Sequence, residues 1–413
     1  MELTAAALPA EETPAVTRER APLAGFVAGI LSSQISNNAM HLVQPLVIAD
    51  LSGSLGLAAF VAAAETGVHM LGTLVSGGSV DRLGSRRALM YATWGRGICL
   101  AFIPLAWAFG GLTLTWALCA YTLDAFVRGW VDSSVHALPL GLAEGDREEL
   151  DRLNAAYEFT FDLASVIGPL LLGALLLTKQ GFAAHAAIPV GFLLAGFLYS
   201  RVPEERVDAV QREKRARTKW LDWDGWRQIA RDPRLLAPVA GLALFNLFPL
   251  RKVWSAFFAK AILGTPAAVG WIGAAFGLGG VIGALLFPRL RLSTRASVLF
   301  GAAGTAALAV SWAPGLLGPM LAGAALFGAA NACAELSLLR ALGELTPAGL
   351  FGRVTSVARV GTTSASVSLK AAMAGAFALG LTPYASFAVV GAGLGVMVLA
   401  QLTVAARLGR TER

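Results

Sequence analysis

The chain has 413 residues, of which 56% are hydrophobic and only 14% are charged, whereas a soluble domain carries about 25% charged residues. The mean hydropathy of +0.64 excludes a soluble globule, because too little polar surface is available to cover one in water. The net charge of +7 does not indicate nucleic-acid binding, since the arginines lie mostly between apolar runs, where membrane-protein loops carry them.

Residues 1–21 form an Ala/Pro/Glu-rich segment with no apolar run of its own. This composition predicts a disordered tail and not a cleaved signal peptide. Cys99, Cys119 and Cys333 all fall in apolar segments and show no CxxC spacing. We therefore expect three buried, unreactive thiols.

Twelve apolar segments follow in chain order, separated by glycine- and proline-containing turns. A helix of about 20 residues crosses the hydrocarbon core of a bilayer, so the pattern predicts an all-α membrane protein with twelve transmembrane helices. The expected spans are 22–47, 57–78, 87–109, 112–139, 151–178, 181–201, 235–261, 267–288, 295–313, 316–342, 354–380 and 384–406.

Basic residues gather in alternate connections, at 82–87, 201–234, 289–295, 353 and 407–413, while the intervening connections are nearly uncharged. Cytosolic loops carry the excess of Lys and Arg, so both termini are expected in the cytosol. The connection at 144–152 is net acidic, but acidic residues contribute little to orientation.

The longest polar segment, 202–234, separates two groups of six spans. We predict a cytosolic tail at 1–21, an N-terminal six-helix half at 22–201, a cytosolic linker at 202–234, a C-terminal six-helix half at 235–408 and a cytosolic tail at 409–413. Trp220, Trp223 and Trp226 predict a short helix on the inner membrane surface near the end of the linker. Two such halves are typical of secondary transporters built from repeats.

A motif lies between the second and third spans, in the segment 77–87. It reads glycine, three residues, aspartate, a base, any residue, glycine, any residue and two bases, and it resembles the signature loop of the major facilitator superfamily. The resemblance implies the major facilitator fold and a gating motif that latches and releases as the two halves rock. The matching residues are Gly77, Asp81, Arg82, Gly84, Arg86 and Arg87.

Shorter matches resemble the bacterial multidrug, macrolide and siderophore efflux branch of that superfamily. They lie at 51–54, 147–155, 167–169, 231–233 and 352–354. The Gly168-Pro169 pair resembles part of an antiporter motif, although the full glycine repeat is missing. The resemblance implies export by exchange across the bacterial cytoplasmic membrane.

Charged residues also occur inside the spans, where each normally faces a partner or a water-filled cavity. Asp124, Arg128, Asp132 and His136 are four residues apart and form one stripe on the fourth helix. One hypothesis is that these residues pair with one another along the stripe. Carboxyl groups in the spans are instead candidates for proton coupling, namely Glu158, Asp162, Asp132 and Glu335.

The N-terminal half carries most of these acids, and the C-terminal half is more cationic. Two such faces could meet across a central cavity at the interface of the repeats. Basic and amide side chains there would bind an anionic or carboxylate-bearing molecule, and the alternative is again internal ion pairing. The candidates are Asn37, His41, Arg128, Asn246, Arg251, Lys252, Asn331, Arg359 and Lys370.

The sequence thus favours a proton-coupled exporter of a small amphiphilic or anionic organic compound, embedded in the bilayer and expected to be a monomer. Alternatives are nutrient import, lipid transport and ferroportin-like metal export, the last from Asn37, Asn38, His41 and Asp162. The four histidines are dispersed, so we predict no metal site. The chain lacks HExxH, GxSxG and Walker motifs, so neither an enzyme nor a cofactor is expected.

Overall fold

The computed structural model describes residues 20–143, 147–177, 181–204, 224–245, 248–346 and 351–411, and all regular structure in these ranges is helical. Seven of the helices are long and apolar enough to cross a membrane by length and composition. Helix α4, which carries Asp124, Arg128 and Asp132, is not among these seven. The predicted all-α membrane fold is confirmed.

The first group of helices consists of α1 (Arg20–Ser52), α2 (Leu55–Leu83), α3 (Ser85–Ala108), α4 (Leu114–Leu142), α5 (Arg147–Leu177) and α6 (Gly181–Ser200). Helix α1 packs against α5 and α6, while α3 packs against α4 and α6, and α2 packs against α4. The turn between α2 and α3 requires a glycine, since Gly84 has φ +86°.

The second group contains α8 (Asp224–Arg231), the 3₁₀ turn η1 (Pro233–Leu235), α9 (Leu236–Phe245), α10 (Phe248–Phe257), the π-helix η2 (Phe258–Ile262), α11 (Ala268–Leu290), α12 (Thr294–Ser311), α13 (Leu317–Leu345), α14 (Phe351–Ala378) and α15 (Pro383–Thr411). Helix α13 packs against α11 and α12, and α15 packs against α12 and α14.

Within the described residues every predicted span lies on helical structure, and the span expected at 235–261 carries α9, α10 and the π-helix, with residues 246–247 outside the described part. Trp220 and Trp223 of the linker lie outside the described residues. Cys99 and Cys333 are buried as expected, but Cys119 is exposed on the outer surface of α4, so that expectation is wrong.

The two groups of helices meet through α2 with α14 and through α5 with α11. Their backbones approach closely at Gly270, where an added methyl group would stand 2.5 Å from Cα of Gly173. The ion pair between Asp50 and Lys260 also joins the two groups. These contacts share the end of the bundle that carries the turns at Gly53 and Gly264, which we call the closed end.

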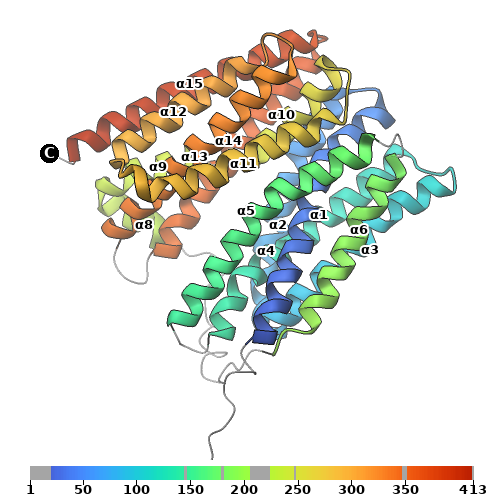
Figure 1. Ribbon diagram of the computed structural model, residues 1–413, viewed down its shortest axis with the longest axis horizontal. Helices are drawn as coiled ribbons and strands as arrows, with labels where there is room; N and C mark the ends of the chain where they lie inside the picture. Colours follow the sequence, from blue (N-terminus) through green and yellow to red (C-terminus); the bar gives the residue numbers. More distant parts are fainter. Residues whose placement is uncertain are drawn as a thin grey trace, which may run out of the picture.

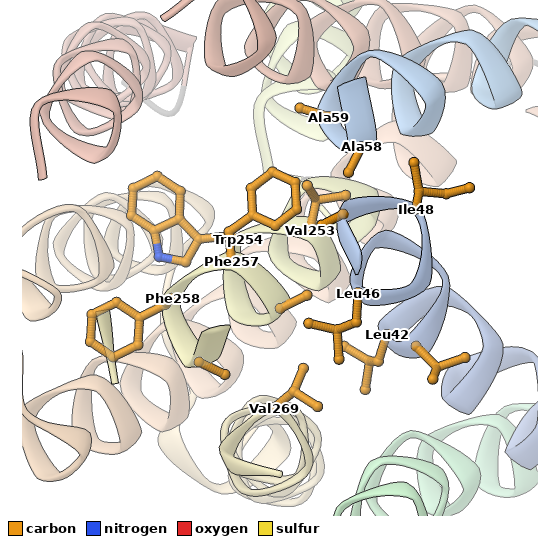
Figure 2. Close-up of a cluster of buried hydrophobic side chains, with 14 of the residues drawn as sticks. Leu42, Leu46, Ile48, Ala58, Ala59, Val253, Trp254, Phe257, Phe258 and Val269 are labelled. Atoms are coloured by element: carbon orange, nitrogen blue, oxygen red, sulfur yellow. The ribbon is translucent and has the colours of Figure 1, made fainter. Parts of the chain in front are cut away.

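Toward the opposite end, where α5 begins and Gly84 lies, the two groups diverge (Figure 1). We call this the open end. Between the two ends lies a buried apolar cluster to which both groups contribute (Figure 2). Its members include Leu42, Leu46 and Ile48 from α1, Ala58 and Ala59 from α2, Val253, Trp254 and Phe257 from α10, Phe258 from the π-helix and Val269 from α11. These buried side chains pack the two groups against each other.

Candidate functional site

A fully buried ion pair lies inside the first group of helices. Arg96 on α3 donates from Nε to Oδ1 of Asp124 at 2.8 Å and from Nη2 to Oδ2 at 3.1 Å, and the two side chains are 2% and 1% exposed. Arg96 also donates to Oδ1 of Asn37 at 3.0 Å, and its guanidinium stands 4.2 Å from the ring centroid of Phe192. Several partners therefore share this buried charge.

Arg96 is absent from the predicted site residues, although a signal for it exists. It is a lone arginine between Gly95 and Gly97 in an apolar span, and a charge in that setting normally has a partner or a function. Asn37, which the sequence predicts to bind substrate, accepts a hydrogen bond from Arg96.

The side chains of Asp124, Arg128 and Asp132 do not pair with one another, so that hypothesis is wrong, although Nδ1 of His136 lies 2.8 Å from the carbonyl oxygen of Asp132 within the stripe. Asp124 pairs with Arg96, Nη1 of Arg128 lies 2.5 Å from Nε2 of His41, and Oδ2 of Asp132 lies 2.8 Å from Nε2 of His69. The partners thus come from α3, α1 and α2. The physical reason is that the stripe faces these three helices, whose polar groups offer better-directed contacts than a neighbour one turn away. Asp132 remains 46% exposed, so water reaches this depth.

Another carboxyl group, Glu65 on α2, is buried beside this stripe. Its Oε1 accepts a hydrogen bond from Nε2 of Gln44 on α1. The contact joins α1 and α2 inside the first group, close to where α14 packs against α2.

Two lysines of the second group are buried at the contact between the groups. Nζ of Lys370 on α14 donates to the carbonyl oxygen of Ala62 at 3.2 Å and to Oγ1 of Thr66 at 3.1 Å, both on α2. Lys252 on α10 borders a small pocket. That pocket is also lined by Asn38, Leu42, Ser165, Pro169, Ser255, Gly273 and Phe276. Lys252 and Lys370, two of the basic residues that the sequence predicts to face the first half, are therefore buried where the two groups meet.

The remaining predicted residues lie elsewhere or outside the described part. Asp162 is partly buried on α5, and its carbonyl oxygen accepts from Oγ of Ser165 at 2.7 Å. Asn331 and Glu335 lie on α13, which packs against α11, α12 and α9. Asn246 lies outside the described residues, and the structure does not describe the surroundings of Gly77 or the side chains of Asp81, Glu158, Arg251 and Arg359.

The arginines of the signature loop tie the start of α3 to the end of α6. Arg86 donates to the carbonyl oxygens of Tyr199 and Ser200 at 3.3 and 2.5 Å, and Arg87 donates to Oε1 of Glu204 at 2.6 Å. The hydrogen bond and positive charge of Arg87 lower the pKa of the Glu204 carboxyl. Arg82 is exposed. These described contacts brace one helical group.

No metal site is visible within the described ranges, where no group of three or more His, Cys, Asp or Glu side chains could hold an ion. The residues that raised the ferroportin-like alternative have other partners. Asn37 accepts from Arg96, and Nδ2 of Asn38 donates to the carbonyl oxygen of Gln34 at 2.9 Å.

Two helical groups that meet at a buried, charged interface, closed at one end and diverging at the other, define a membrane transporter. The chain belongs to the Major Facilitator Superfamily, whose family model matches residues 25–259.

Curated relatives are efflux proteins. The chain is 35% identical over 141 residues to the multidrug efflux pump Tap of Mycobacterium tuberculosis, which is 33% of each chain. It thus spans about a third of the length of the first curated relatives it matches. It is 28% identical over 403 residues to the enterobactin exporter EntS of Shigella boydii, covering 94% of this chain and 92% of EntS.

Solved structures share the fold at low identity. A bacterial homologue of the iron transporter ferroportin in its inward-facing state aligns with a TM-score of 0.70 at 19% identity, covering 93% of this chain and 98% of the other. A peptide transporter of the POT family aligns with a TM-score of 0.69 at 15% identity, covering 94% and 95%.

Proposed function

We propose that this protein is a proton-coupled exporter of a small amphiphilic or anionic organic compound. The observation that carries the proposal is the placement of Lys252 and Lys370 from the second group, both buried at the contact with the first group. A bound molecule at that contact touches both groups, so its binding energy depends on how they are oriented. The efflux activities named for Tap and EntS support export as the direction.

The proposed cycle alternates access between the two ends of the bundle. The open end carries Arg82, Arg86 and Arg87, and basic loops favour the cytosolic side. The proposal therefore puts the open end and both termini in the cytosol of a bacterium, with the chain acting as a monomer in the inner membrane. The conformation described here would then receive substrate from the cytosol.

The pocket beside Lys252 supports the substrate class. An ammonium group attracts a carboxylate, a catecholate or another anion, while Leu42, Pro169 and Phe276 offer apolar contact. A molecule with an acidic group and an apolar body fits such a lining. Other residues proposed to contribute are His41, Arg128, Asn246, Arg251, Asn331, Arg359 and Lys370.

Proton coupling requires a carboxyl group that reaches water in turn from each side. Asp132 is 46% exposed, contacts His69 and lies on the part of α4 nearer the open end. Glu158, Asp162 and Glu335 are proposed as further candidates from their positions on α5 and α13.

The test uses purified protein in sealed liposomes that contain a pH-sensitive dye. A proton gradient is imposed, and movement of enterobactin, an anionic catecholate, and of ethidium, a cationic dye, is followed with proton flux. We expect enterobactin to move uphill in exchange for protons, and Glu158→Gln, Asp162→Asn or Asp132→Asn to reduce that exchange. Glu344→Gln, which neutralises an exposed acid at the end of α13, is the matched control.

The proposal fails if the wild-type protein moves neither compound against its gradient when protons flow. Uphill movement of ethidium alone would replace the anionic substrate class with a cationic one. Uphill movement without proton flux would remove proton coupling and leave the exporter.

A further inference from the structure

Glu65 is a carboxyl group buried at the centre of the molecule, to which the sequence patterns assign no role. In the described part of the chain its one hydrogen-bond partner is Gln44, and no cation lies within ion-pair distance of it. A buried acid normally has an ionic partner, because an isolated charge in an apolar setting is costly. The group is therefore suited to gain and lose a proton.

The amide of Gln44 fits both forms of this acid. Its Nε2 donates to Oε1 of Glu65, and such a bond can be accepted by a carboxylate oxygen or by the carbonyl oxygen of a protonated acid. Oε2 is left to carry the proton. Protonation therefore changes the charge of Glu65 without breaking the bond that positions it.

A movable positive charge lies on the same turn of α2. Lys370 donates to Ala62, three residues before Glu65, and to Thr66, the residue directly after it. Lys370 belongs to α14 of the second group, whereas Glu65 and Gln44 belong to the first. Relative motion of the two groups changes the distance from this ammonium to Glu65, while the Gln44 contact remains within one group.

The other charged or titratable groups facing this region belong mainly to the first group of helices. Those on α1, α3 and α4 keep their places relative to Glu65 when the halves rock as rigid bodies. Lys252 on α10 is the second lysine that moves with the other group. The groups concerned are His41 on α1, Arg96 on α3, Tyr121, Asp124, Arg128 and Asp132 on α4, and His69 on α2 itself.

We propose that Glu65 is the proton-binding site of the transport cycle and that Lys370 is the counter-charge that α14 brings to it and removes from it. This inference rests on the proposed proton-coupled function and assigns its proton site. With the closed end shut, the nearby ammonium stabilises the carboxylate, and the proton leaves to water at the open end. When the closed end opens, α14 moves away from α2, and Glu65 takes a proton from water on that side. Only the O–H bond of the acid forms and breaks.

The experiment compares Glu65→Gln with wild type in the same liposomes, using enterobactin and ethidium as probes. Glutamine keeps the shape and hydrogen bonding but cannot release a proton. We expect uphill transport driven by the proton gradient to fall to background, while exchange of labelled for unlabelled probe at equal concentrations continues. Retained exchange shows that the variant is folded and alternates. Glu344→Gln should behave like wild type in both assays.

Lys370→Met provides the second readout. Without the ammonium the proton is held more firmly, so the pH profile of uphill transport should move to higher pH. The double variant Glu65→Gln with Lys370→Met should be no worse than Glu65→Gln alone, because both act on one step. A role for Lys370 in structure or substrate binding alone would instead lower exchange and uphill transport together, with no movement of the pH profile.

Infrared difference spectra of the purified protein between acid and alkaline pH give a test without substrate. The carbonyl band of a protonated carboxyl group that is shielded from water, which is separate from the band of exposed acids, should be missing in Glu65→Gln and present in Glu344→Gln. Uphill transport that survives Glu65→Gln, or a band that survives it, overturns the assignment of Glu65 and leaves the exporter standing. Failure of wild-type uphill transport overturns the proposed function as well.

Discussion

Buried basic side chains occur both inside the first helical group and at the contact between the two groups, but their partners differ in the two places. Arg96 and Asp124 both come from the first group, and their two hydrogen bonds are shielded from water. Lys370 and Lys260 cross from the second group and bind oxygens of the first. Pairs within one group hold its shape, whereas pairs between groups can exchange when the groups move.

The two kinds of contact differ in whether their partners move relative to each other when the two helical groups rock, as the proposed cycle requires. An internal pair feels no change when the halves rock, so its strength does not oppose transport. A contact between halves must break in every cycle, so its strength adds to the barrier. Strong pairs are therefore tolerated inside one group, and weak or replaceable contacts suit the interface.

The largest expected effect comes from breaking the internal pair. Asp124→Ala leaves the Arg96 guanidinium buried without its carboxylate, and breaking such a pair costs about 3–5 kcal/mol. Thermal unfolding in detergent should show a large loss of stability. The double variant Arg96→Met with Asp124→Leu removes both charges and should recover much of it. An unchanged melting temperature for Asp124→Ala would mean that the pair does not hold the group together.

The next effect tests the contact between the groups without touching a charge. Gly270→Val places a side chain against Gly173 and the carbonyl oxygen of Pro169, each 2.5 Å from the first added carbon. Overpacking of this kind costs about 1–3 kcal/mol, and the closed end should open in response.

Distances between spin labels at the exposed positions Phe109→Cys and Leu379→Cys, in a background without the three native cysteines, would report the opening as a longer separation. Gly318→Val is the control, because no atom stands within 4 Å of the added carbon. Equal distance distributions in the two valine variants would show that the α5–α11 contact does not keep this end shut.

A smaller change in the distance between the spin labels is expected when the ion pair at the closed end is removed. Asp50 is 72% exposed, and an exposed pair contributes about 0.2–1 kcal/mol. Asp50→Asn should lengthen the same label distance slightly, and high salt should produce a similar change in the wild-type protein. A shift as large as that of Gly270→Val would indicate that Lys260 and Asp50, and not helix packing, shut this end.

The smallest effect on stability is expected from the ion pair between Arg87, at the start of α3, and Glu204, which follows α6. Arg87 lowers the folded-state pKa of Glu204 below its ordinary value of 4.5, so the carboxylate contributes stability above that value. This contribution is lost as the pH falls through the lower folded-state pKa. Glu204→Gln should therefore melt slightly below wild type at neutral pH, and the difference should vanish in acid. A difference that grows in acid would contradict this sign.

The fold follows from features that a single sequence displays. The length of the apolar segments, the turn residues between them and the motif at 77–87 are all patterns of residues that are close in the sequence. They therefore predict the helices and the family without any knowledge of how the helices pack. The partners of Asp124, Arg128 and Asp132 depend on how α1, α2 and α3 are rotated about α4. That rotation leaves no periodic signal, which explains why the partners of these three residues could not be predicted. Arg96 itself is visible in the sequence as a lone arginine in an apolar span, but its pairing with Asp124 is not.

The π-helix at Phe258–Ile262 bears on how the closed end can vary among related chains. Its widened turn, seen in the bond from the N–H of Leu263 to the carbonyl oxygen of Phe258, accommodates one residue more than an α-turn. Deleting one residue there would rotate the rest of the turn by about 100° relative to α10 and carry Lys260 away from Asp50. A single codon gained or lost at this position would thus alter the closed end while leaving the helices that bear the charged interface unchanged.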